Sequence, residues 1–125
     1  MAALTKHLLS EIEAISGRRF VISSTAASAA NVFHVTPDTT GIDEMWVYAH
    51  NYGASDAQVS FMWAMTSMPS TSATTIQEGV DITIPYKSGR ALVFDGTLMP
   101  HGLSAAAYST IASTISIDGF VNRIT

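Results

Sequence analysis

The chain has 125 residues, of which 47% are hydrophobic and only 13% are charged, and its formal net charge is −4. It contains no cysteine, which excludes disulfides and thiolate metal sites, and its six basic residues are too scattered for a nucleic-acid footprint. The length fits one domain, and the low charge favours a protein that covers part of its surface with copies of itself or with a partner.

Two long stretches without charged residues, 57–77 and 96–117, are long enough to be considered as membrane spans. Pro69 and many Ser and Thr residues interrupt the first, and Pro100 interrupts the second, so neither is the continuous apolar run of about 20 residues that a spanning helix needs. Near the N-terminus, Lys6 and two glutamates break up any secretory hydrophobic segment. We therefore expect no signal peptide and no membrane segment.

The first predicted element is an amphipathic helix over residues 5–16. Its apolar residues recur at steps of four, four and three positions, which places them on one stripe: Leu4, Leu8, Ile12 and Ile15. Gly17 follows where a left-handed C-terminal cap belongs. A helix of about three turns is marginal alone, so the stripe must dock on its own domain or on a neighbour. The predicted division is an N-terminal helix or arm, 1–17, and one β domain, 18–125.

After Gly17 the hydrophobic period changes to two, the period of β-strands. Turn residues separate the alternating runs, which are 19–24, 31–36, 45–50, 59–65, 80–84, 91–94, 103–109 and 115–121. The run at 45–50 is apolar on both faces, which is typical of a central strand. We expect Asp95 and Gly96 to end the strand before them, Gly119 to form a bulge, and residues 67–75 to form a surface loop.

About eight short strands separated by turns indicate an all-β fold. The predicted architecture is an antiparallel β-sandwich or jelly roll with the short N-terminal amphipathic helix attached. Five aromatic residues lie in or beside two neighbouring strands, namely Trp46, Tyr48, Tyr52, Phe61 and Trp63. They either fill the core or form an exposed platform on which sugars or bases stack. Alternation of Phe61 and Trp63 with smaller residues favours a core position for these two.

No residue pattern in the chain specifies a reaction, a metal site or a cofactor. The four histidines lie in different elements, without the spacing of metal ligands. Asp43 and Glu44 are adjacent, so on a strand they point to opposite faces. There is no nucleophile elbow and no glycine-rich phosphate loop. The prediction is a protein that is not an enzyme and has no cofactor; a jelly-roll hydrolase or isomerase would require His34, His50 and a carboxylate to converge on a metal.

From Phe33 onward the chain resembles a family of short structural proteins of tailed bacteriophages. The segments that carry the resemblance are FHVTP, GIDEMWVYAHN, QVSFMWA, ITIPYKSGRALVFDG and ISIDGFVNRIT. The resemblance implies a virion component of the capsid decoration or cement type. Such a protein is made in the cytoplasm of the host bacterium and lies on the outer surface of the head.

The resemblance also implies partners. These are the major capsid protein and two further copies of the chain in a homotrimer, with no nucleic acid and no membrane. Candidate interface residues are Leu4, Leu8, Ile12, Ile15, Trp46 and Tyr48. An alternative is a tail, adaptor or head-fibre component that contacts other virion proteins or host glycans.

Overall fold

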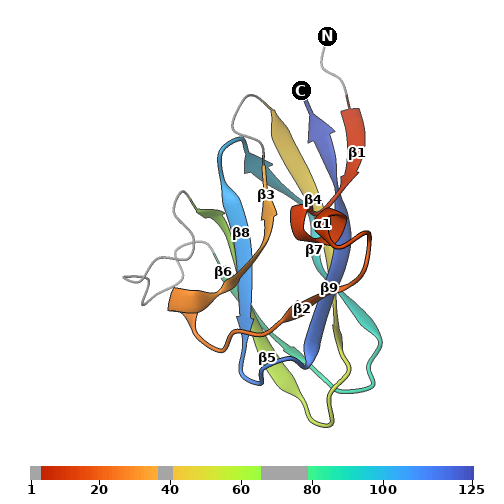
Figure 1. The fold of residues 1–125 in the computed structure, drawn as a ribbon, viewed down its shortest axis with the longest axis vertical. Helices are drawn as coiled ribbons and strands as arrows, with labels where there is room; N and C mark the ends of the chain where they lie inside the picture. Colours follow the sequence, from red (N-terminus) through yellow and green to blue (C-terminus); the bar gives the residue numbers. More distant parts are fainter. Residues whose placement is uncertain (1–3, 37–40, 66–78) are drawn as a thin grey trace.

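The computed structural model describes residues 4–36, 41–65 and 79–125, so the predicted loop at 67–75 lies outside the described residues. Within them the fold is all-β, with two antiparallel sheets packed as a sandwich (Figure 1). The elements in chain order are β1 Leu4–Leu8, α1 Ser10–Ala14, β2 Phe20–Ile22, the 3-10 turn η1 Ala27–Ala29, β3 Asn31–Val35, β4 Ile42–Asn51, β5 Ala57–Met65, β6 Gly79–Ile84, β7 Arg90–Pro100, β8 Ser104–Ser109 and β9 Ile115–Ile124. No helix in the described part of the chain is long and apolar enough to cross a membrane.

The two sheets are built from nested strand pairs. The first sheet has the order β1-β9-β4-β7, with β2 pairing with β9 beyond the end of β1, and the second has the order β3-β8-β5-β6. Four strand pairs are nested in the sequence, each enclosing the next: β2–β9, β3–β8, β4–β7 and β5–β6. Pairing of β4 with β9 joins two of them into the first sheet, and pairing of β5 with β8 joins the other two into the second. The predicted runs all form strands, and β4 is central in its sheet as expected.

The core lies between the sheets and follows the alternation of each strand. In β4 every second residue is buried, from Asp43 to Asn51. Phe61 makes edge-to-face contacts with Phe33 and Phe94 at 6.1 and 5.6 Å between ring centroids, and Trp63 meets Phe94 at 5.2 Å. Each such ring contributes roughly 1.5–3 kcal/mol on burial. The core position predicted for Phe61 and Trp63 is confirmed, although Trp63 is only partly buried.

The predicted three-turn helix at 5–16 is wrong. Leu4–Leu8 is a strand that pairs along its whole length with β9, and only Ser10–Ala14 is helical. A short isolated helix gains little free energy, whereas the edge of β9 offers a full ladder of hydrogen bonds to the same residues. The predicted chain reversal at the helix end is present, with positive φ at both Ser16 and Gly17 and a hydrogen bond from the Gly17 N–H to the Ile12 carbonyl.

Two expectations about glycines also fail. β7 does not end at Asp95 but runs on to Pro100, because register shifts against β4 and the positive φ of Gly96 absorb the irregularity. Gly119 forms no bulge, since its pairing with β4 is continuous. A Cβ at Gly119 would collide with the backbone carbonyl oxygen of Trp46, so this position needs glycine for close approach of two strands.

Candidate functional site

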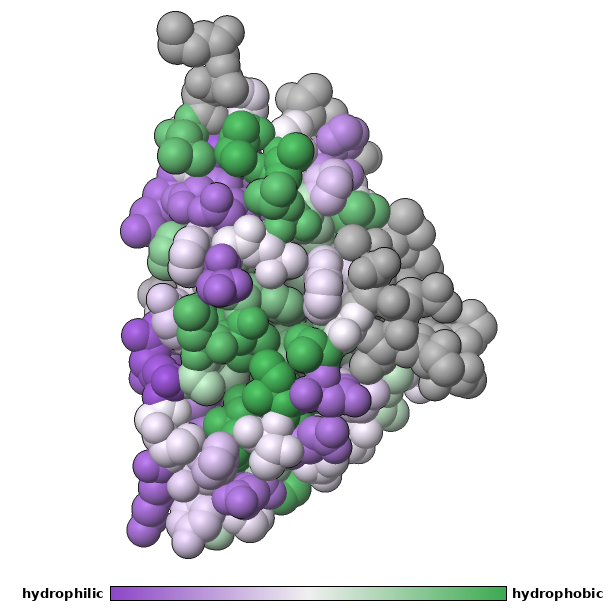
Figure 2. Space-filling model, turned by 180° about the vertical axis from the view of Figure 1, so that it is seen from behind, coloured by the Kyte–Doolittle hydropathy of each residue, from purple (hydrophilic) through white to green (hydrophobic). Residues whose placement is uncertain are grey.

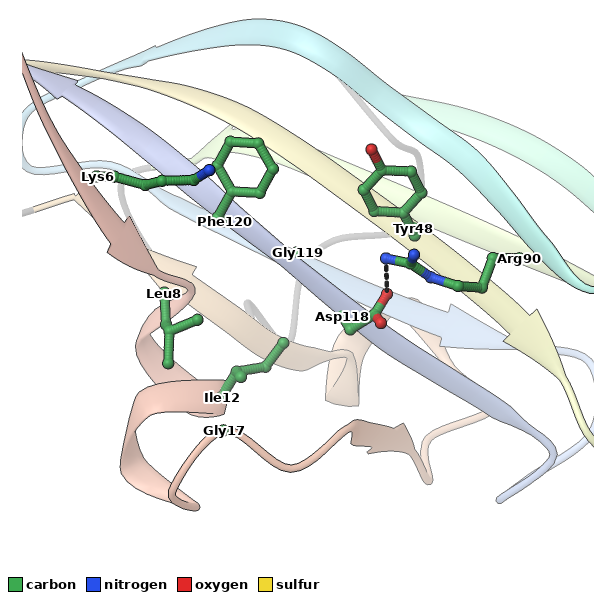
Figure 3. Close-up of a pocket in the computed structure, with 9 residues that line it drawn as sticks. All are labelled: Lys6, Leu8, Ile12, Gly17, Tyr48, Arg90, Asp118, Gly119 and Phe120. Atoms are coloured by element: carbon green, nitrogen blue, oxygen red, sulfur yellow. Dashed lines mark hydrogen bonds and ion pairs between the residues drawn. The ribbon is translucent and has the colours of Figure 1, made fainter.

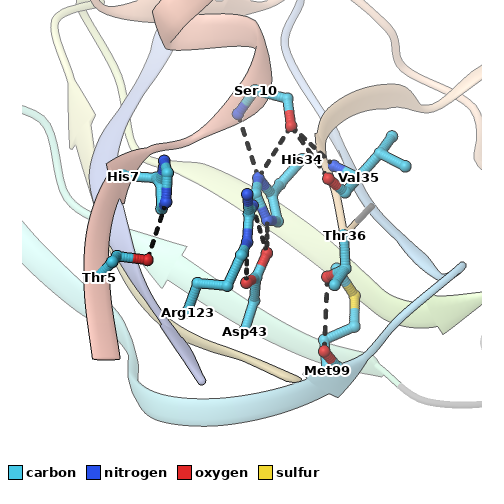
Figure 4. Close-up of polar contacts among 9 residues, drawn as sticks. All are labelled: Thr5, His7, Ser10, His34, Val35, Thr36, Asp43, Met99 and Arg123. Carbon is cyan, nitrogen blue, oxygen red and sulfur yellow. Dashed lines mark hydrogen bonds and ion pairs between the residues drawn. The ribbon is translucent and has the colours of Figure 1, made fainter. Parts of the chain in front are cut away.

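Two groups of polar side chains are candidates for function, one inside the sandwich and one on its surface. The inner group, which we name the buried tie, consists of Ser10, His34, Asp43 and Arg123 (Figure 4). It connects α1 and β3 with β4 and β9, so its contacts cross from one sheet to the other. The side chains of His34 and Asp43 are fully buried, and that of Arg123 is 19% exposed.

Hydrogen bonds fix the protonation pattern of the buried tie. The Ser10 backbone N–H donates to Nδ1 of His34 at 3.1 Å, so the neutral ring carries its proton on Nε2 and donates it to Asp43 at 2.6 Å. Arg123 donates from Nε and a terminal nitrogen to the two oxygens of the same carboxylate, at 2.7 and 3.0 Å. Burial raises the pKa of Asp43, but the hydrogen bonds from His34 and Arg123, together with the positive charge of Arg123, outweigh burial and hold that pKa well below its usual range.

The buried tie contains the residue types of a serine–histidine–aspartate triad, but its geometry is that of a structural connection. The Ser10 hydroxyl accepts a hydrogen bond from the Val35 N–H and lies within hydrogen-bond distance of the Val35 carbonyl and His34 Nδ1. His34 and Asp43 are sealed from solvent, so a substrate cannot reach the imidazole in this arrangement. The buried tie therefore fastens the segment after β1 to the body of the sandwich.

The prediction that Asp43 and Glu44 point to opposite faces is confirmed. Glu44 lies on the outer face of the first sheet, where it accepts hydrogen bonds from Trp46 Nε1 at 2.7 Å and Asn122 at 3.0 Å. These two donors hold the pKa of Glu44 below its usual range. His50 also lies on this outer face and contacts Arg19, so it does not meet His34. No group of three metal-ligating side chains occurs among the residues that the structure describes.

The outer face of the first sheet is arranged in rows of directly paired residues across the strands. From the end that carries the two termini (Figure 1), the rows are Leu4–Ile124–Ile42–Pro100, Lys6–Asn122–Glu44–Leu98, Leu8–Phe120–Trp46–Asp95, then Asp118–Tyr48–Leu92, and last Val21–Ser116–His50–Arg90. The first row is entirely apolar, and with Leu98 we name it the terminal patch. The middle rows combine aromatic and charged side chains.

The terminal patch is well exposed: Leu4, Ile42 and Leu98 retain 66, 37 and 54% of their accessible surface. Seen from behind (Figure 2), hydrophobic side chains also gather in the middle of the molecule and toward the end that carries the termini. The surface is therefore uneven in polarity, with apolar side chains grouped rather than spread evenly. Large apolar areas of this kind are typical of contact surfaces.

A groove opens in the middle rows, where pairing along β9 is interrupted. β1 pairs with residues 120–124 and β2 with residues 115–117, so Asp118 and Gly119 have no strand partner on that side. α1 and the turn that follows it pass around this gap. The groove has a volume of about 460 Å³. The residues that line it include Lys6, Leu8, Tyr48, Arg90, Asp118 and Phe120 (Figure 3).

Two cations lie over two aromatic rings at the groove. Lys6 Nζ is 4.1 Å from the ring centre of Phe120, and the Arg90 guanidinium carbon is 4.1 Å from that of Tyr48. Arg90 also donates to Asp118 at 3.1 Å. The rings hold these flexible cations in place at the surface, which lowers the entropic cost of binding a ligand there.

The predicted interface residues separate in the structure. Leu4, Leu8 and Ile15 are exposed, whereas Ile12 is 2% exposed and belongs to the core. Trp46 and Tyr48 lie partly buried on the outer face, and Tyr52 is exposed in the turn after β4. Of the five aromatic residues that could have formed an exposed platform, Trp46 and Tyr48 lie on the outer face of the first sheet. Phe120 joins them there, with its ring parallel to that of Trp46.

Sequence reasoning did not single out four groove residues: Lys6, Arg90, Asp118 and Phe120. The alternation in β9 contained part of the signal, since it puts Asp118 and Phe120 on the same face. Comparisons with models of protein families, with curated protein sequences and with solved structures each found no match to this chain.

Proposed function

We propose that this chain is a virion structural protein of the capsid decoration type, which binds the assembled head shell and two copies of itself. The observation that carries the proposal is the terminal patch, an exposed apolar row that crosses β1, β9, β4 and β7 of the first sheet at the end where both termini lie. A contact surface on a rigid sheet loses little conformational entropy on binding. The partners that this proposal names are the major capsid protein and the other subunits of a homotrimer.

The strand order gives further support by analogy of fold. The nested pairs β2–β9, β3–β8, β4–β7 and β5–β6 support a jelly roll as the finer description of this sandwich, an architecture that viral capsid and lectin domains share. We include the jelly-roll assignment in the proposal. The resemblance of FHVTP, GIDEMWVYAHN and ISIDGFVNRIT to phage structural proteins agrees with it.

The test combines light scattering with sedimentation of head shells that lack the protein. We expect a trimer in solution that co-sediments with assembled shells but does not bind free capsid subunits. Leu4→Asp with Leu98→Asp should weaken trimerisation and shell binding at least about tenfold, because both changes place charge in the apolar contact. Both side chains are exposed, so the double variant should remain folded by circular dichroism.

The matched control is Tyr52→Asp with Tyr86→Asp, which introduces the same two charges at positions that are 51 and 45% exposed and lie outside the terminal patch. It should bind shells as the unmodified protein does. A monomer that does not bind shells would overturn the proposal. Normal shell binding by the Leu4→Asp, Leu98→Asp variant would show that the terminal patch is not the contact surface.

A second candidate function is a tail, adaptor or head-fibre component that contacts host glycans. The specific observation in its favour is the groove, where aromatic rings and fixed charged groups meet on the same outer face. Sites for small ligands typically combine apolar walls with a few well-placed polar groups.

A further inference from the structure

We infer that the groove binds a sugar residue that carries a carboxylate group. The inference gives a ligand class to the second candidate function and rests on it. It does not depend on shell binding, because the groove rows and the terminal patch are different parts of the outer face.

The first argument is charge. Arg90 donates to Asp118 at 3.1 Å and Arg19 lies 4.0 Å from it, so this single carboxylate faces two guanidinium groups. Lys6 forms no ion pair with any residue in the described part of the chain, and its ammonium group rests on Phe120. The nearby carboxylate of Glu44 is engaged by Trp46 and Asn122 and does not line the groove. The groove is thus lined by two cations, Lys6 and Arg90, and by one carboxylate, Asp118, which Arg19 also approaches. This excess of positive charge favours an anionic ligand.

The geometry of the two cationic groups favours a carboxylate as the anionic part of the ligand. A guanidinium group recognises a carboxylate through two parallel hydrogen bonds, and an ammonium group adds a point charge. Arg90 is fixed by both Tyr48 and Asp118, and Lys6 is fixed by Phe120. Both cations line the same groove (Figure 3). They are thus positioned before a ligand arrives, so a carboxylate bound in the groove meets a fixed cation at one end or the other.

The third argument is the remaining surface of the groove. Leu8 supplies exposed aliphatic surface on one wall, and the rings of Phe120 and Tyr48 supply aromatic surface on the other. A pyranose ring presents C–H groups to surfaces of this kind and hydroxyl groups to acceptors such as Asp118. The volume of about 460 Å³ falls within the range of small-ligand sites, roughly 300–1,000 Å³. A sugar acid therefore matches the groove better than a simple inorganic anion, which would leave the apolar walls uncovered.

The experiment compares two ligands that differ only in the carboxylate, methyl glucuronide and methyl glucoside, by NMR titration of the isolated full-length protein. We expect saturable shifts of the Asp118 and Gly119 amide signals with the glucuronide and binding about tenfold weaker for the glucoside. Acetate serves as the probe for a carboxylate without a sugar ring and should bind more weakly than the glucuronide. Added salt should weaken glucuronide binding, because the cations are exposed.

The structure offers a matched pair of variants. Lys6→Met removes the ammonium group beside Phe120 and should weaken glucuronide binding about tenfold. Lys87→Met removes the corresponding group of a lysine–tyrosine pair outside the groove, where Lys87 Nζ lies 5.9 Å from the ring of Tyr86, and should leave binding unchanged. Equal binding of glucuronide and glucoside, shifts outside the groove, or no saturable shift would each overturn the inference. Shell binding is measured separately, so a failure here leaves the decoration proposal standing.

Discussion

The buried tie and the groove both take residues from β4 and β9, and each contains one aspartate–arginine pair. Asp43 and Arg123 meet inside at 2.7 and 3.0 Å with the carboxylate fully buried, while Asp118 and Arg90 meet outside at 3.1 Å with 29 and 48% exposure. The paired groups are the same, but the inner carboxylate accepts two hydrogen bonds from Arg123 and one from His34, whereas the outer one accepts a single hydrogen bond from Arg90. Position relative to the core therefore decides whether such a pair fastens the fold or remains available to a ligand.

The largest loss of stability is expected when the aspartate–arginine pair inside the sandwich is disrupted. Asp43→Asn removes the negative charge that His34 and Arg123 share in the interior, and it should lower the free energy of unfolding by about 3–5 kcal/mol. Asp118→Asn makes the same change on the outer face and should cost less than about 1 kcal/mol. Urea unfolding of the two variants measures the difference. Equal losses would show that the buried tie stabilises no more than a surface pair.

A second contrast lies within the N-terminal segment, where Leu8 and Ile12 were predicted on one helical stripe. Ile12→Asp buries an unpaired carboxylate at a position that is 2% exposed, so we expect a loss of about 3–4 kcal/mol. Leu8→Asp alters a residue that is 44% exposed on β1 and should cost less than about 1 kcal/mol. Thermal melts of the two single variants test this, and a Leu8→Asp protein that unfolds first would contradict the strand position of Leu8.

The failure of the helix prediction has a physical cause in the same residues. Leu4, Leu8 and Ile12 fit a spacing of four, but Leu4, Lys6 and Leu8 also alternate with Thr5 and His7, so the segment satisfies both periods. The choice between them depends on the free edge of β9, which lies at the other end of the sequence. Local pattern cannot contain that information. The strands after Gly17 were predictable because their alternation has no competing helical period.

For the buried tie and the groove, too, the sequence predicted which face a residue lies on but not which residues meet. Asp43 and Glu44 were assigned correctly to opposite faces, because adjacent residues on a strand must alternate. The partners of Asp43 are 9 and 80 positions away, on β3 and β9, and the groove pair Arg90–Asp118 is separated by 28 positions. Those meetings follow from strand order and register, which a single sequence does not determine.

The smallest expected effect is the loss of stability of the unmodified protein in acid. It compares the buried and the exposed aspartate without a substitution. The pKa of Asp43 is held below its usual range in the folded protein, so in acid the unfolded chain binds a proton that the folded protein does not. The contribution of Asp43 is complete above the unfolded pKa, near 4, and the free energy of unfolding should fall below that pH by up to about 1.4 kcal/mol per pH unit.

Urea unfolding of the unmodified protein at pH 7, 5 and 3 measures this slope, with Asp118→Asn as the matched variant. That variant should show the same acid loss, because the buried carboxylate is intact. Asp43→Asn, measured where it is folded, should lose less stability between pH 5 and pH 3, since the group whose pKa is lowered by His34 and Arg123 is gone. If the acid loss instead disappeared in Asp118→Asn, the outer pair would be the one coupled to folding, and the assignment of roles to the two sides of the sheet would have to be reversed.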